Sequence, residues 1–152
     1  MKRAALRFDT MEDVILWVAS RKKPPPQRPC PTEEEEQMRL IAWKWEAMKQ
    51  YPELSLLHAI PNGSYRLKHQ AVRLAHTGTL AGIPDLALPV ARKGAHSLYL
   101  EMKALDGSIS TLQIERAVQL VDAGNCVAFA WGWQMARDVL VWYLDKKGDN
   151  TK

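Results

Sequence analysis

Two short apolar runs on either side of a basic loop constrain the fold of this chain most strongly. The first run, 85–90, opens with Asp85, and the second is SLYLEMKA at 97–104. Apolar runs of this length, joined by a short loop, are typical of strands that pair as a hairpin. In such a hairpin Asp85, at the start of the first strand, lies close to Glu101, near the end of the second.

The second run places two opposite charges on one face of a strand. Side chains of a strand alternate between its faces, so Glu101 and Lys103 point the same way, roughly 6–7 Å apart along the chain, and Met102 points to the other face. A pair of this kind is usually a solvated surface feature. Here, however, Gly82 and Pro84 precede the aspartate and indicate a close, fixed approach of the backbone to this region. Two carboxylates and an amine placed together can hold a divalent cation beside an activated water.

Five separated motifs occur along the chain in a recognisable order. They are Glu34-x-x-Gln37 in a helix, AIPNGSYR at 59–66, GTLAGIPDLALP at 78–89, LYLEMKA at 98–104 and Ser110-x-x-Gln113. Their order resembles the VRR-NUC family of the PD-(D/E)xK nuclease superfamily, especially its small stand-alone phage members, over residues 33–144. The resemblance implies an α/β fold with a restriction-endonuclease-like α-β-β-β-α-β core, whose mixed central sheet is flanked by helices. It also implies a metal-dependent DNA endonuclease acting on branched, flapped or four-way junction DNA.

The resemblance assigns roles to individual residues. Asp85, Glu101 and the Met102 carbonyl would hold Mg2+ or Mn2+. Lys103 would orient the attacking water and help to deprotonate it, and burial or a nearby cation would lower its pKa for that task. Gln113 would aim its amide at the water or at Lys103, or would instead make a hydrogen bond at the end of its helix.

A fourth carboxylate comes from a helix that we expect to begin at Thr32 and to run to about Tyr51. Its apolar residues recur at the spacing of one buried stripe: Met38, Ile41, Trp45 and Met48. Glu34 extends this stripe by one turn and is therefore predicted to face the core and the metal. The other acids of the run Glu33 to Glu36 remain alternatives.

Basic residues predict a nucleic-acid partner. The net charge is +4, and residues 64–93 carry five cations against the single acid Asp85. Cations that neutralise phosphates around a carboxylate site suit a DNA substrate, branched or duplex. The predicted DNA-binding residues are Asn62, Arg66, Lys68, Arg73, Arg92 and Lys93. A nucleic-acid-binding module without catalysis is the alternative function, and a soluble basic surface without a partner is the simplest alternative for the charge.

The chain is expected to divide into a helix and Pro-rich linker at 1–32, a nuclease domain at 33–146 and a polar tail at 147–152. Within the domain we expect strands at 54–60, 125–132 and 139–144, and helices at 68–75, 110–123 and 133–140. The N-terminal helix, 10–20, and the segment VLVWYL at 139–144 are surplus apolar surfaces that predict a homodimer. The absence of a signal pattern and of a long apolar segment predicts a cytoplasmic protein of a bacterial host or phage-infected cell, without a membrane partner.

Overall fold

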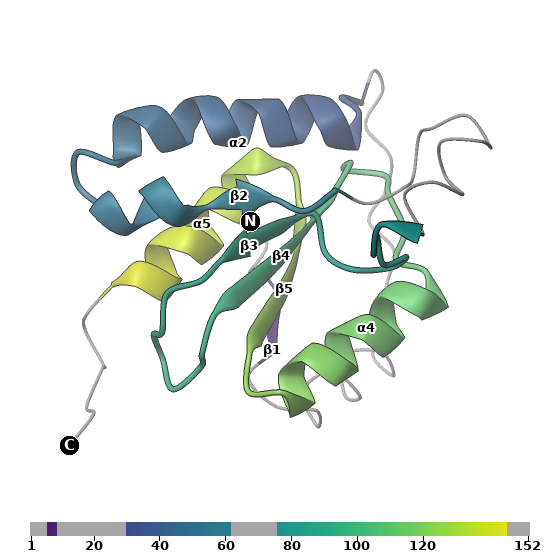
Figure 1. Ribbon diagram of the computed structural model, residues 1–152. Helices are drawn as coiled ribbons and strands as arrows, with labels where there is room; N and C mark the ends of the chain where they lie inside the picture. Colours follow the sequence, from purple (N-terminus) through teal and green to yellow (C-terminus); the bar gives the residue numbers. More distant parts are fainter. Residues whose placement is uncertain (1–5, 9–29, 62–75, 146–152) are drawn as a thin grey trace.

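A mixed sheet lies at the centre of the computed structural model, which describes residues 6–8, 30–61 and 76–145 (Figure 1). The elements in chain order are β1 (Leu6–Phe8), α2 (Glu33–Ala47), the 3-10 helix η1 (Pro52–Leu56), β2 (His58–Ala59), β3 (Leu86–Leu88), β4 (Leu98–Lys103), α4 (Thr111–Asp122), β5 (Cys126–Trp131) and α5 (Trp133–Leu144). From α2 to β5 this is the α-β-β-β-α-β order that the sequence predicted, with η1 as an addition. The fold class is thereby confirmed.

The described strands lie side by side in the order β1-β5-β4-β3-β2. β3 and β4 pair antiparallel, with Leu86 opposite Leu100, so the predicted hairpin is confirmed. β4 and β5 pair parallel, and α4 connects them on one side of the sheet, as a parallel crossover requires. β5 lies between β1 and β4, and its residues Cys126 to Ala130 are buried, in agreement with its continuously apolar sequence.

Helices cover both faces of the sheet. On one face, α2 and α5 enclose a core that includes Leu40, Leu100, Met102 and Leu140 (Figure 1). On the other face, α4 packs a smaller cluster that includes Phe129 against β5. The two faces of β4 therefore contact different layers, and its alternation places Glu101 and Lys103 on the α4 side.

The predicted buried stripe of α2 was right for Ile41 and Met48, which are partly buried against the core, and wrong for its other two residues. Met38 and Trp45 are 66% and 61% exposed, and the buried residues are instead Glu36, Leu40 and Lys44, which recur every four residues. Two of these three are charged, so a search for apolar spacing passes over them. The helix also ends at Ala47, earlier than predicted, although its start at Glu33, after the N-cap Thr32, is close to the predicted start.

Two other predicted segments differ from the structure. The run 54–60 forms part of η1 and the two-residue strand β2 rather than one strand. The segment VLVWYL continues α5, where Val139, Leu140, Tyr143 and Leu144 are buried at helical spacing. These side chains pack in the core of their own chain, so VLVWYL does not supply the dimer surface that we expected, and the homodimer stays a prediction.

β1 was not predicted and pairs antiparallel with β5 through residues 6–8. The predicted helices at 10–20 and 68–75, the Pro-rich linker and the tail at 147–152 lie outside the described residues, apart from the linker's last residues. Among the helices that the structure describes, none is long and apolar enough to cross a membrane.

The hydroxyl of Tyr143 ties α5 to the hairpin, since it donates to the Val90 carbonyl at 2.7 Å and the residue is fully buried. We expect Tyr143→Phe to lower the free energy of unfolding by about 1–2 kcal/mol in urea denaturation, because a carbonyl in the protein loses its donor. Tyr51→Phe is the matched control, since the Tyr51 hydroxyl bonds only at the surface, to Gln50. Equal losses in the two variants would contradict a stabilising role for the Tyr143 bond.

Candidate active site

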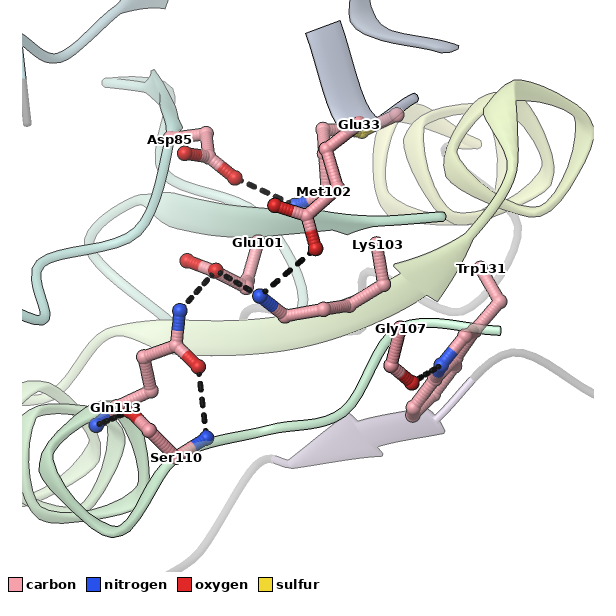
Figure 2. A network of polar contacts seen from close by, with 9 residues as sticks. All are labelled: Glu33, Asp85, Glu101, Met102, Lys103, Gly107, Ser110, Gln113 and Trp131. Atoms are coloured by element: carbon pink, nitrogen blue, oxygen red, sulfur yellow. Dashed lines mark hydrogen bonds and ion pairs between the residues drawn. The ribbon is translucent and has the colours of Figure 1, made fainter. Parts of the chain in front are cut away.

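Lys103 lies at the centre of a network of polar contacts at the end of β4 (Figure 2). Its Nζ is 2.8 Å from Glu101 Oε1 and 3.3 Å from Glu33 Oε1. Glu101 and Lys103 are only 2% and 3% exposed, so this is a buried ion pair rather than the solvated strand face that is common for such a triplet. The prediction that Glu101 and Lys103 share a face is confirmed.

Asp85 approaches the same strand from β3. Its Oδ2 accepts a hydrogen bond of 2.8 Å from the Met102 N–H, which brings it beside Glu101 (Figure 2). Gly82, three residues earlier, has a φ of +76°, and a Cβ on it would meet the Leu112 side chain at 2.7 Å. The glycine therefore lets the loop before Asp85 pack directly on the start of α4, as the sequence indicated.

Gln113 makes the helix-end hydrogen bond that the sequence offered as one of its two roles, and its amide points at Glu101 rather than at Lys103. Its Oε1 accepts from Ser110 N at 2.9 Å and its backbone N–H donates to Ser110 Oγ, which is the capping box of α4. Its Nε2 at the same time donates to Glu101 Oε1 at 2.5 Å. The cap fixes the glutamine side chain, and the fixed side chain aims its amide at the buried carboxylate.

Of the four acids at the start of α2, the structure brings Glu33 to the site. Thr32 and Glu35 form a capping box, which makes Glu33 the first residue of the helix and leaves Glu34 exposed. Glu36 is buried, but its hydrogen bond comes from Trp133 N and not from the Lys103 side chain. The capping-box spacing of Thr32 and Glu35 was the sequence signal that could have identified Glu33.

Burial and neighbouring charges shift two pKa values. Burial, followed by the charge of Asp85, raises the pKa of Glu101 to about 7, although Lys103 acts in the opposite direction. Burial alone would lower the pKa of Lys103, but the charges and hydrogen bonds of Glu101 and Glu33 outweigh it and the pKa is raised. The expectation of a lowered lysine pKa was wrong for this arrangement, because two carboxylates face the ammonium.

The donor set fits a hard divalent cation in part. Among the described residues, no group of three or more His, Cys, Asp or Glu is arranged to hold a metal. Asp85 and Glu101 nevertheless lie close together, and Glu101 Oε2 is buried with no hydrogen-bond partner. A buried carboxylate oxygen without a donor suits Mg2+ or Mn2+, which take few protein ligands and keep several waters.

The predicted DNA-binding residues divide into two groups. Asn62, Arg66, Lys68 and Arg73 lie outside the described residues. Arg92 and Lys93 belong to the hairpin loop at the opposite end of β3 and β4 from Asp85. There Arg92 pairs with Glu53 at 2.8 Å and Lys93 donates to the Asp145 carbonyl. They do not surround the acidic site, because the hairpin carries them a strand's length away from it.

Glu101 should make stability depend on pH. Its folded pKa of about 7 lies above its ordinary value of 4.5, so the unfolded chain loses its proton first and stability falls as pH rises from 4.5 to 7. Glu101→Gln removes this loss. Measured in EDTA, the melting temperature of this variant should rise relative to that of the wild type as pH increases across this range. The corresponding relative gain in unfolding free energy is up to about 3 kcal/mol. The exposed Glu115→Gln is the matched control, and a constant difference between Glu101→Gln and the wild type would contradict the shift.

Comparison with models of known families found no match, and neither did comparison with curated proteins. Among solved structures, a chain titled "VRR_NUC domain protein" matches with a TM-score of 0.62 and 28% sequence identity. The match covers 75% of this chain and 88% of that chain. The structural similarity and the order of the sequence motifs therefore support the VRR-NUC family, with its PD-(D/E)xK-like fold, as the family of this chain.

Proposed function

We propose that this chain is a divalent-metal-dependent DNA endonuclease that selects branched, flapped or four-way junction DNA. One observation carries the proposal. Asp85, Glu101, Lys103 and Gln113, from the loop before β3, from β4 and from α4, meet at one end of the sheet. Within this group a carboxylate oxygen is buried without a donor. A protein without catalytic activity gains nothing from such an arrangement. Phosphodiester hydrolysis, in contrast, needs charge neutralisation, an oriented water and a proton acceptor.

Asp85, Glu101 and the Met102 carbonyl would hold Mg2+ or Mn2+ in this proposal. When bound, the ion would neutralise charge on the phosphate and lower the pKa of a coordinated water. Gln113 would keep the Glu101 carboxylate oriented, since its own side chain is fixed by Ser110. In this proposal the glutamate from α2 would be Glu33 rather than Glu34, because Glu33 contacts Lys103.

Lys103 would position the attacking water through Nζ. Its raised pKa means that the ammonium holds its proton while Glu101 and Glu33 both face it. Lys103 can accept a proton from the water only when the negative charge around it is reduced and its pKa falls. Neutralising the charge of Glu101 would remove the larger of the two carboxylate contributions, which is why the cation and the lysine belong to one mechanism.

For DNA we propose contacts from the segment that carries Asn62, Arg66, Lys68 and Arg73. This segment follows β2, the neighbour of β3 in the sheet, and leads into the loop that delivers Asp85. Arg92 and Lys93 have partners at the other end of the hairpin and are weaker candidates. Contacts of this kind to the phosphate backbone would fix position without reading sequence.

Replacing either metal-binding carboxylate should abolish cleavage. We expect Asp85→Asn and Glu101→Gln to lose detectable cleavage of end-labelled flaps and four-way junctions with Mg2+ or Mn2+, because a hard cation needs both anionic oxygens. DNA affinity, measured by fluorescence anisotropy, should change little. Glu115→Gln, on the exposed side of α4, is the control and should keep wild-type turnover. Wild-type turnover in either site variant would refute the assignment, and DNA binding without cleavage by the wild type would favour a non-catalytic binding module.

Lys103 should be required for more than its charge. We expect Lys103→Ala to lower the cleavage rate by about 10²-fold or more, as for a group that takes part in proton transfer. Lys103→Arg should lose a similar factor, because a guanidinium keeps its proton at neutral pH. Lys49→Ala, which removes an exposed amine, provides the control. Activity retained by the arginine variant would show that Lys103 contributes only positive charge.

A further inference from the structure

Glu36 is a buried carboxylate to which the proposed cleavage gives no role. It lies on α2 one turn after Glu33 and is only 3% exposed. Its Oε2 accepts a hydrogen bond of 2.8 Å from Trp133 N, and its Oε1 is 3.5 Å from the exposed guanidinium of Arg39. A carboxylate this deeply buried is costly unless it has a specific partner, and here the close partner is a main-chain N–H.

That N–H belongs to the first residue of α5, a helix whose own N-cap residue has no side chain. The N-cap is Gly132, with a φ of +83°, and no side chain of α5 caps its free N–H groups. Glu36 therefore caps α5 from a different helix. A negative charge at a helix N-terminus is also favoured by the helix dipole, so the contact holds both helix ends together.

The same junction is bonded to the main chain of Lys103. Gly132 N donates to the Lys103 carbonyl at 2.9 Å, while Glu33 contacts the Lys103 side chain at 3.3 Å. Residues three apart on a helix lie on the same side, so Glu33 and Glu36 both face this junction. The contacts close a ring that runs from Lys103 through Gly132, Trp133, Glu36 and Glu33 back to Lys103.

We propose that Glu36 is a positioning residue for the site. By capping α5, it fixes the first turn of α2 against the end of β4 and so keeps the Glu33 carboxylate on the Lys103 ammonium. The other fixed contact of this turn, the capping box of Thr32 and Glu35, lies within α2 and does not tie the helix to the sheet. The catalytic part of this inference rests on the proposed nuclease function.

Two substitutions at one position isolate the hydrogen bond. Trp133→Pro removes the N–H that Glu36 binds, and proline is well tolerated at the first position of a helix. The proline would follow Gly132, whose ψ of 157° is one that a residue before proline can adopt. Trp133→Ala loses the same indole packing but keeps the N–H. With Mn2+ and a branched DNA substrate, we expect kcat of Trp133→Pro to be about 10- to 100-fold below that of Trp133→Ala, with KM unchanged. Equal kcat values would overturn the inference.

Substitutions at Glu36 provide a second test. Glu36→Gln keeps an oxygen that can accept from Trp133 N and should stay within about threefold of wild-type kcat, whereas Glu36→Ala should fall as Trp133→Pro does. Adding Glu33→Gln should change kcat in the Trp133→Ala background and have little effect in the Trp133→Pro background. Equal losses in both backgrounds, or a Glu36→Gln variant as impaired as Glu36→Ala, would overturn the positioning role.

A readout without DNA separates this inference from the proposed function. If the wild type cleaves no substrate, the proposed function fails, and the inference is decided by urea unfolding of the same proteins. Glu33→Gln should shift the urea midpoint more in the Trp133→Ala background than in the Trp133→Pro background, because only the former holds Glu33 on Lys103. Equal shifts would refute the inference whatever the chain does to DNA.

Discussion

The buried ion pair between Glu101 and Lys103 on β4 is the interaction on which the surrounding structure depends. Removing two charges from water costs several kcal/mol for each ion, and their mutual attraction compensates only when further hydrogen bonds satisfy them. The neighbouring elements supply these partners: Gln113 from α4 and Glu33 from α2. Even so, one oxygen of Glu101 has no donor. The chain therefore organises three elements around a pair that a purely structural core would avoid.

Features of the site that arise from local rules could be predicted from the sequence. The alternation of a strand put Glu101 and Lys103 on one face, and the length of the loop joined β3 and β4 as a hairpin. Ser110 and Gly124 marked the ends of α4, which the structure places at Thr111 and Asp122. Each of these depends on residues a few positions apart, where spacing alone decides the geometry.

The failures involve partners that are distant in sequence. The buried face of α2 carries Glu36 and Lys44, whose polar atoms bond to Trp133 N, 97 residues away, and to the Leu57 carbonyl. No spacing within the helix reveals that a charge has such a partner, so the apolar residues Met38 and Trp45 were placed inside instead. The segment VLVWYL was predicted as a strand for a related reason, because a short apolar run fits a strand and a buried helix equally well.

The two ends of the hairpin differ in how their charges are balanced. In the loop beyond β3, Arg92 pairs with Glu53, Lys93 bonds to the Asp145 carbonyl, and Tyr143 bonds to Val90. At the other end, burial and the charge of Asp85 raise the pKa of Glu101. Natural sequences tend to break structural rules where function requires it. Both ends are built from the same two strands and enclosed by the same helices, so the strain at Glu101 is not a general weakness of the fold. At that end Asp85 and Glu33 add negative charge to a site where one oxygen of Glu101 lacks a donor, which is the condition that binding a cation would relieve.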